Sequence, residues 1–82
     1  MQGTVLIIDD DIDMAAFLVE MLRRRGFDAS AVHSARACLR HLERHGCDVV
    51  VTDIKMDQMS GIELCERLRL QHPHLLTIMV TG

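Results

Sequence analysis

The sequence has few of the residues that mark several common protein classes. It contains no tryptophan and no tyrosine, and Phe17 and Phe27 are its two phenylalanines. The interior of such a chain must be aliphatic, and six methionines are available to fill its gaps. One proline and five glycines among 82 residues provide no linker. With 49% hydrophobic residues, the composition is that of one small globular domain and not of a disordered chain.

Other absences limit where the protein acts and what it binds. No apolar run approaches membrane-spanning length, and the N-terminus lacks the charged start and apolar stretch of a signal peptide, so we expect no membrane partner. The net charge of -3 gives no electrostatic reason to expect direct nucleic-acid contact by this segment. The three cysteines, Cys38, Cys47 and Cys65, are widely spaced and odd in number, which argues against a disulfide framework. We therefore expect a reducing, cytoplasmic location.

What the sequence does contain is an alternation of apolar runs with helical patterns. Four apolar runs predict strands at residues 4–9, 28–33, 48–53 and 75–80. Helical spacing of apolar residues predicts three helices between them, at residues 11–25, 34–45 and 61–71. The third run, DVVVTD, has the pattern of a strand that is buried on both faces. This alternation is typical of a parallel α/β sheet with right-handed crossovers.

The predicted helices have recognisable ends and inward faces. Ser34 can cap the second helix, and Gly26 and Gly46 follow the ends of the first and second. The arginines at 23–25 fit a helix C-terminus, where cations meet the negative pole of the dipole, better than they fit a phosphate-binding patch. Glu20 is spaced to pair with Arg24 outside the first helix. The side chains expected to face the core are Ala15, Leu18, Val19, Leu22, Ala35, Cys38, Leu39, Leu42, Leu64, Cys65 and Leu68.

Acidic residues stand where the predicted strands end. Asp9 and Asp10 end the first strand, Asp53 ends the third, and Thr81 ends the fourth. In parallel α/β sheets, ligands bind beyond the carboxyl ends of the strands, near a switch in strand order. If the first and third strands are neighbours, the three carboxylates converge. Like charges at such short range repel one another unless a cation lies among them. An all-oxygen site with few protein ligands suits Mg²⁺, beside which a carboxylate can act as a nucleophile and form an aspartyl phosphate.

Three stretches, LIIDDD, VVVTDIKM-x-x-MSG and IMVTG, carry a resemblance to the receiver domain of bacterial two-component response regulators. The resemblance implies a flavodoxin-like (receiver, CheY-like) doubly wound parallel sheet, here with the first four strands and three helices. It implies that Asp53 is the phosphoacceptor, that Asp10 and Asp53 bind Mg²⁺ directly, and that Asp9 acts largely through water. The main-chain carbonyl of Lys55 would be a further metal ligand. The Thr81 hydroxyl would reach for the phosphoryl group and pass the change onward.

The same resemblance implies a regulatory phosphoacceptor and not an enzyme. A sensor histidine kinase or phosphotransfer protein would supply the phosphoryl group from a phosphohistidine. A C-terminal output domain would respond to it, and the IMVTG ending is like that of receivers attached to transcriptional output domains.

The sequence departs from the family pattern in two ways. Asp57 stands after Met56, where the family usually has proline, and adds a charge near the expected site. The family's fold also continues through a fourth helix, a fifth strand and a fifth helix. Residues 1–82 are therefore expected to be a receiver domain that is incomplete at its C-terminus. The lysine that pairs with the phosphoryl group in the family lies on the missing part.

A missing third of the fold would leave apolar surface uncovered. Residues 75–80 would be an unpaired aliphatic sheet edge, which is a template for another chain. Met14, Phe17 and Met21 form a second apolar strip beside the core stripe of the first helix. We therefore expect either a piece of a longer ordered protein or association, as a dimer through the fourth strand and the first helix.

The acids of the first strand admit two other interpretations. Asp9, Asp11 and Asp13, with Glu20 at the twelfth place, imitate a calcium-binding EF-hand loop, although Met14 stands where that loop needs glycine. The same acids resemble the motif of haloacid-dehalogenase phosphatases, which would make Asp9 the nucleophile. That interpretation leaves the carboxylate of the third strand unexplained.

Two further alternatives concern single elements. Cys38, His41 and His45 stand at helical spacing and could form a zinc site, although a core cysteine with two surface histidines explains them better. Asp53 could cap the following loop through backbone N–H groups. A separate alternative for the whole chain is a structural or protein-interaction fragment that cannot be phosphorylated.

Overall fold

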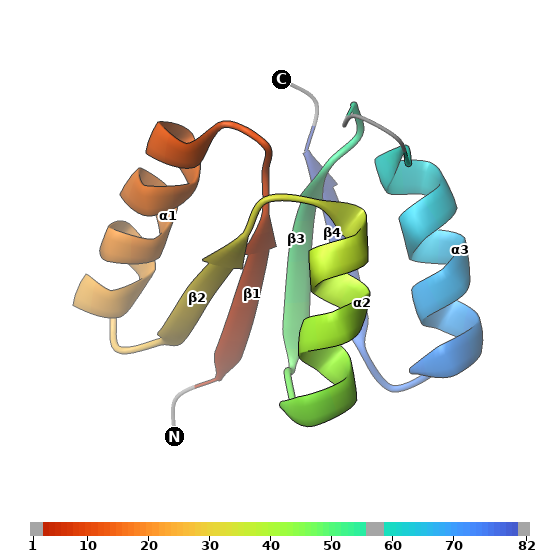
Figure 1. Cartoon of the computed structure of the whole chain (residues 1–82). Coiled ribbons are helices and arrows are strands. Elements are labelled where there is room, and N and C mark those ends of the chain that lie inside the picture. The colour runs from red at the N-terminus through yellow and green to blue at the C-terminus, as the bar shows by residue number, and fades with distance from the viewer. Residues whose placement is uncertain (1–2, 56–58, 81–82) are drawn as a thin grey trace.

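The computed structural model of the 82-residue chain describes residues 3–55 and 59–80. Four strands alternate with three helices along the chain: β1 (Thr4–Ile8), α1 (Ile12–Arg24), β2 (Asp28–Val32), α2 (Ala35–Arg44), β3 (Val49–Asp53), α3 (Gly61–Gln71) and β4 (Leu76–Val80). The strands are all parallel and lie in the order β2-β1-β3-β4 (Figure 1). The predicted parallel α/β sheet is confirmed, and β1 and β3 are neighbours.

Each predicted strand is one residue longer than the strand in the structure. Asp9 and His33 were expected to belong to the first and second strands, but β1 ends at Ile8 and β2 ends at Val32. The Asp9 N–H still donates to the Val32 carbonyl at 3.2 Å, so the two chains separate only after that bond. At their starts, β3 and β4 begin one residue after the predicted positions.

The sheet has two unlike faces, because side chains alternate along each strand. Leu6, Ile8 and Val50 are buried against α2 and α3, and we call this side the two-helix face. Val5 and Ile7 point the other way, where Ala15 of α1 is buried among them, and we call this side the one-helix face. Figure 1 shows α1 beside β2 and β1, with α2 and α3 on the other side of the sheet.

The prediction that the third strand is buried on both faces is wrong for the one-helix face. Val50 and Thr52 are fully buried, whereas Val49 and Val51, which alternate with them along the strand, are half-buried. The reason lies in the position of α1, which makes its sheet contacts with β1 and β2. Among residues 3–55 and 59–80, no helix covers β3 and β4 on that side.

The cap predicted at Ser34 is confirmed, whereas α1 is one residue shorter at each end than the predicted 11–25, because Asp11 and Arg25 are its caps. Asp11 and Ser34 cap α1 and α2, because their side-chain oxygens accept the Met14 and Ala37 N–H groups at 3.1 Å. Gly26 adopts a φ of 94°, the left-handed conformation that glycine tolerates and that ends α1. Gly46 has no positive φ, and α2 ends instead at His45 in an extended conformation.

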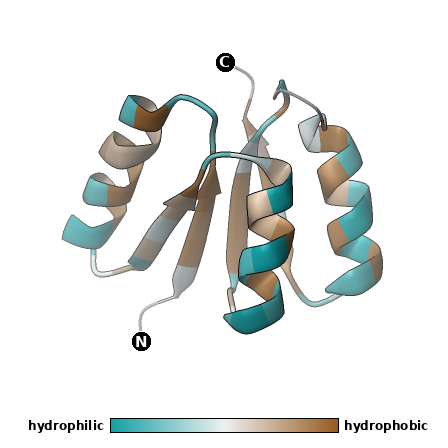
Figure 2. Ribbon diagram, in the orientation of Figure 1, coloured by the Kyte–Doolittle hydropathy of each residue, from teal (hydrophilic) through white to brown (hydrophobic). Residues whose placement is uncertain are grey.

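The inward faces of the helices agree with the predicted set. Ala15, Cys38, Leu64 and Leu68 are fully buried. The outward faces mix polar side chains with exposed apolar ones (Figure 2), among them Phe17 and Leu70. The other predicted inward residues, apart from the buried Ala35, are half-buried against the sheet or beside it: Leu18, Val19, Leu22, Leu39, Leu42 and Cys65. Within the described residues, no helix has the length and apolar character needed to cross a membrane.

Candidate metal and phosphoacceptor site

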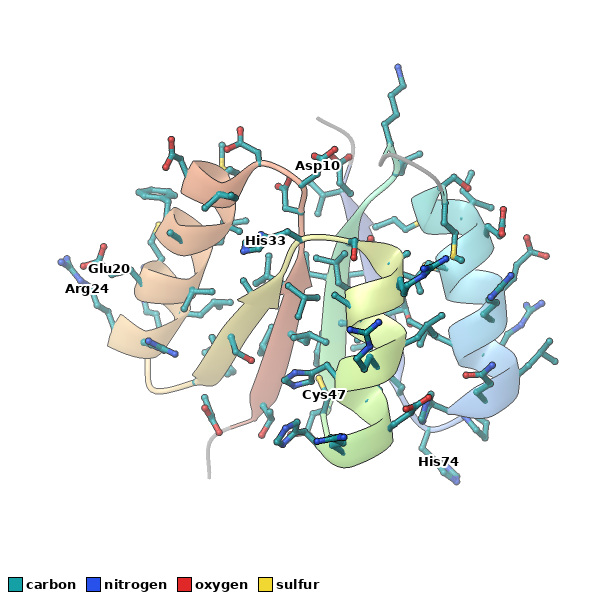
Figure 3. The ribbon with its side chains drawn as sticks, in the orientation of Figure 1. Asp10, Glu20, Arg24, His33, Cys47 and His74 are labelled. Carbon is teal, nitrogen blue, oxygen red and sulfur yellow. The ribbon has the colours of Figure 1, made fainter. Side chains whose placement is uncertain are left out.

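Three carboxylates meet at the carboxyl ends of the two central strands. Asp9 and Asp10 directly follow β1, and Asp53 is the last residue of β3. One oxygen from each carboxylate can be chosen so that all three lie within 4.8 Å of one another. Asp9 and Asp53 are half-buried and Asp10 is exposed, at the end of β1 (Figure 3). The convergence predicted from the sequence is confirmed, and the chemical roles of the three residues stay predictions.

The donor set of this cluster fits a hard divalent cation. Mg²⁺ prefers oxygen ligands and uses one or two carboxylates while keeping several waters. A half-exposed group of three carboxylates offers such ligands and leaves room for water and for phosphate oxygens. Two partly buried carboxylates with a third beside them repel one another, and a bound cation relieves that repulsion.

Backbone contacts fix the orientation of Asp9. Its Oδ1 accepts the Asp11 N–H at 2.9 Å, which turns the chain from β1 into α1. Its main-chain carbonyl lies 3.0 Å from Nδ1 of His33, a residue that follows β2. Sequence reasoning gave His33 no role, because a single histidine at the end of a strand carries no pattern.

The Asp53 carboxylate also meets the backbone of its own loop. Its Oδ1 accepts the Lys55 N–H at 3.3 Å. This is the loop-capping contact that the sequence left open as an alternative role for Asp53. A carboxylate has two oxygens and several lone pairs, so one such contact is compatible with metal binding by the same group.

Gly61 brings α3 directly against the end of β3. A Cβ at this position would overlap the carbonyl oxygen of Asp53 and lie 2.9 Å from Cα of Ile54. The Gly61 N–H donates to the Ile54 carbonyl at 2.8 Å. The strand end that carries Asp53 is therefore pressed against the first residue of α3. The sequence showed this glycine only as the last letter of the MSG stretch, and its steric role needed the three-dimensional structure.

Several predicted participants lie outside the described residues. Thr81 is one of them, and so are Met56 and the Asp57 that departs from the family pattern. Lys55 is described and exposed, and its proposed carbonyl ligand stays a prediction.

A hollow of about 220 Å³ lies below the carboxylates on the one-helix face. Its walls are largely apolar and come from β1, α1, β3 and β4, with Asp9 and Asp53 at its edge. Apolar walls lower the local dielectric constant, so charge–charge interactions at its edge are stronger than in open water.

The alternative zinc site is not assembled. Cys38 is fully buried, and desolvation by burial is the main cause that raises the pKa of its thiol to about 12. A thiol that stays protonated is a poor metal ligand. The rings of His41 and His45 stack with their centroids 4.7 Å apart. In residues 3–55 and 59–80, the carboxylate cluster is the one group of His, Cys, Asp or Glu side chains that is close enough to hold a metal.

The calcium-loop interpretation of the first acids is wrong. Asp11 is the N-cap of α1 and Asp13 lies in its first turn, so no loop surrounds them. Glu20 pairs with Arg24 at 3.1 Å on the exposed side of the same helix (Figure 3). The predicted end of α1 at the arginines is confirmed, and Arg23 also donates from Nε to the Ala29 carbonyl at 3.0 Å.

The fold and the carboxylates together define a class of protein. A parallel sheet of order β2-β1-β3-β4 reverses its winding direction between β1 and β3, and the acids stand at that switch point. The model of the response regulator receiver domain family matches residues 5–82. The chain belongs to this family, whose members are regulatory modules of two-component systems that interact with histidine kinases and output domains.

Curated relatives agree with this assignment. The chain is 37% identical over 79 residues to the sensory transduction protein RegX3 of Mycolicibacterium smegmatis. This alignment covers 96% of this chain and 34% of that protein. It is 32% identical over 78 residues to the response regulator receiver protein CpdR of Brucella abortus, covering 95% of this chain and 65% of that protein. The chain thus spans about a third of the length of RegX3.

Solved structures show the same fold. A response regulator receiver protein from Pseudomonas putida superimposes with a TM-score of 0.94 at 27% identity, over 100% of this chain and 69% of the other. A CheY-like receiver domain protein from Methanospirillum hungatei gives 0.94 at 29% identity, over 100% and 66%. The flavodoxin-like, CheY-like fold is therefore confirmed. The family assignment also disfavours the haloacid-dehalogenase alternative for Asp9.

Proposed function

We propose that this chain is a phosphoacceptor module that receives a phosphoryl group on Asp53 from a phosphohistidine of a sensor histidine kinase or phosphotransfer protein. In the transfer, an Asp53 carboxylate oxygen attacks phosphorus, the bond between phosphorus and the histidine nitrogen breaks, and that nitrogen keeps the electron pair. The product is an aspartyl phosphate, and the chain acts as a signalling switch and not as an enzyme with its own substrate.

One observation carries the proposal. Oxygens of Asp9, Asp10 and Asp53 lie within 4.8 Å of one another at the switch point of a receiver-type sheet. This grouping supports the proposal because it places the proposed nucleophile, Asp53, at a strand end with the carboxylates of Asp9 and Asp10 beside it.

The neighbouring acids have distinct roles in this proposal. Asp10 and Asp53 would bind Mg²⁺ directly, Asp9 would act largely through water, and the Lys55 carbonyl would be a further ligand. Bound Mg²⁺ would neutralise the negative charge that gathers between the carboxylate and the phosphoryl oxygens. The protein's contribution is to hold the carboxylates together, which the Asp9–Asp11 and Asp53–Lys55 contacts favour.

The rest of the switch is proposed on the family's pattern. The Thr81 hydroxyl would approach the phosphoryl group, and the response would pass to a C-terminal output domain, of transcriptional type, in the cytoplasm. We propose that residues 1–82 are the N-terminal part of a receiver domain. The 66–69% coverage of the solved receivers supports this proposal.

Phosphoryl labelling tests the nucleophile. We expect acetyl phosphate with Mg²⁺ to label the full-length protein and Asp53→Asn to abolish the label, because an amide cannot form the acyl phosphate. We expect weak or no labelling of the 82-residue chain, which lacks the family's phosphoryl-pairing lysine; preorganised charges of that kind contribute several kcal/mol. A label that survives on Asp53→Asn, or that maps to Asp9, would reject Asp53 as the phosphoacceptor.

A Mg²⁺ titration tests the metal site separately. Asp10→Asn should weaken Mg²⁺ binding more than Asp11→Asn, because Asp11 caps α1 through its Oδ1 contact with the Met14 N–H. Both variants remove one charge, so long-range electrostatics affects them alike. Equal losses of affinity would contradict the assignment of Asp10 as a ligand.

A further inference from the structure

We propose that His33 is a positioning residue of the carboxylate site: its imidazole N–H holds the Asp9 carbonyl and thereby sets where the Asp10 carboxylate lies. This inference rests on the proposed Mg²⁺ site and concerns a residue outside the carboxylate cluster. His33 directly follows β2, the strand that neighbours β1, and lies near the loop that carries Asp10 (Figure 3).

The contact has one chemically consistent assignment of protons. His33 Nδ1 is 3.0 Å from the Asp9 carbonyl oxygen. A carbonyl oxygen only accepts hydrogen bonds, so Nδ1 must carry the proton and donate it. The distance is that of an ordinary N–H···O hydrogen bond.

The backbone of His33 is anchored on both sides. Val32, the residue before it, accepts the Asp9 N–H at 3.2 Å as the last bond between β1 and β2. Ser34, the residue after it, caps α2 through the Ala37 N–H at 3.1 Å. His33 thus lies between a strand end and a helix cap. Both contacts restrain its backbone, and this fixes the point from which its ring reaches the Asp9 carbonyl.

The Asp9 carbonyl matters because it shares a peptide plane with Asp10. The peptide unit is planar, so a bond that fixes the Asp9 carbonyl oxygen also fixes the direction in which the Asp10 nitrogen and Cα leave. The Asp9 N–H is held by Val32, and the Asp11 N–H is held by Asp9 Oδ1 at 2.9 Å. The His33 contact lies between these two and restrains the plane that joins Asp9 to Asp10.

Asparagine and alanine separate positioning from simple packing at residue 33. Asparagine has a side-chain N–H₂ that can donate from about the place of Nδ1, but it lacks the ring. Alanine has neither donor nor ring. If the donated hydrogen bond is what matters, His33→Asn retains the function of the native side chain and His33→Ala loses it.

The test is Mg²⁺ affinity in the full-length protein, measured by titration with the metal alone. We expect His33→Ala to weaken Mg²⁺ binding by about two- to tenfold, the range set by one net hydrogen bond. We expect His33→Asn to stay within about twofold of the native affinity. His74→Ala is the matched control, because His74 is exposed and lies at the opposite end of the sheet (Figure 3); it should leave the affinity unchanged.

Amide chemical shifts of the metal-free protein give a second readout. In His33→Ala, the Asp10 amide should shift and broaden because its peptide plane loses a restraint, and in His33→Asn it should return toward the native position. Thermal unfolding should stay near that of the native protein in both variants, since the ring of His33 is exposed.

The outcomes distinguish this inference from the proposed function. If Asp10→Asn weakens Mg²⁺ binding and His33→Ala does not, the positioning role is overturned and the metal site stands. If the asparagine and alanine variants lose affinity equally, the ring acts by packing and the hydrogen-bond role is overturned. If Asp10→Asn leaves the affinity unchanged, the metal site itself is wrong and this inference is overturned with it.

Discussion

The two faces of the sheet are built from the same four strands and differ in how well they are covered. On the two-helix face, Leu6, Ile8 and Val50 are at most 1% exposed. On the one-helix face, Val49 and Val51 of β3 are only half-buried. Their β4 neighbours, Leu76 and Ile78, are 58% and 45% exposed. The difference shows that strand pattern alone does not decide burial, because the helices that lie over a strand decide it.

The face that is less well covered is also the face that borders the carboxylate site. The hollow below Asp9 and Asp53 opens on this side, between α1 and the end of β4. Met14, which lines the hollow, and Phe17 and Met21 of the same helix are all more than 40% exposed. The well-packed face gives the strands a fixed position, and the open face leaves apolar surface next to the site.

The largest expected effect is on folding stability and compares a matched pair of leucines. Leu6→Ala should reduce the free energy of unfolding by about 2–5 kcal/mol, because it leaves a cavity in the two-helix core. Leu76→Ala should cost well under half as much, since the side chain is mostly solvated already. Urea unfolding of both variants measures the difference. Equal losses would mean that the one-helix face is covered as tightly as the other.

A glycine pair tests how closely α3 packs against the strand end. Gly61→Ala should destabilise the protein by about 1–3 kcal/mol, because its Cβ would overlap the Asp53 carbonyl and force α3 away. It should also weaken Mg²⁺ binding, because the overlap pushes on the strand end as well as on α3, and that strand end carries a proposed ligand. Gly46→Ala is the control, with no atom within 4 Å of the added Cβ. A Gly61→Ala protein with native stability and metal affinity would show that α3 moves aside freely.

Much of the fold was predictable because its signals are local. The acids at strand ends, the cap Ser34, and Gly26 with its φ of 94° each act within a few residues of their place in the chain. The convergence of Asp9 with Asp53 needed only one further inference, that β1 and β3 are neighbours.

The features that sequence reasoning missed depend on contacts between distant elements. Half-burial of Val51 depends on where α1 lies, which no pattern in DVVVTD records. The His33 contact crosses 24 residues to Asp9, and the Gly61 contact joins the start of α3 to the end of β3. Such contacts follow from the assembled sheet and leave no periodic trace in the sequence.

Association through the open face is a smaller expected effect. We predict that the 82-residue chain self-associates through β4 and the strip of Met14, Phe17 and Met21, because an exposed aliphatic edge strand can pair with another copy. Ile78→Lys should weaken association at least about tenfold in analytical ultracentrifugation. Ile62→Lys is the control, since Ile62 is similarly exposed but lies on α3. A compact native monomer with cooperative unfolding would contradict this prediction.

The smallest expected effect concerns the thiols on the two-helix side of the sheet. Cys38 is fully buried among Leu6, Val50 and Leu64, and Cys65 is half-buried on α3. At about pH 8, a thiol reagent should label Cys65 within the native state. It should label Cys38 only as fast as the protein opens, because the reactive thiolate requires exposure. Labelling of Cys38 at the rate of Cys65 would show that the two-helix face opens readily.

The same thiol gives a pH dependence with a definite sign. Burial raises the pKa of Cys38 from 9.0 to about 12, so above about pH 9 the unfolded chain loses this proton while the folded chain keeps it. Stability therefore falls as pH rises from about 9 toward 12, and below pH 9 this group contributes no pH dependence. Urea unfolding at several alkaline pH values should show a shallower fall for Cys38→Ala than for the native chain. Parallel pH profiles would mean that the Cys38 thiol ionises as easily in the folded protein as in the unfolded one, and that the two-helix face is less dry than its packing indicates.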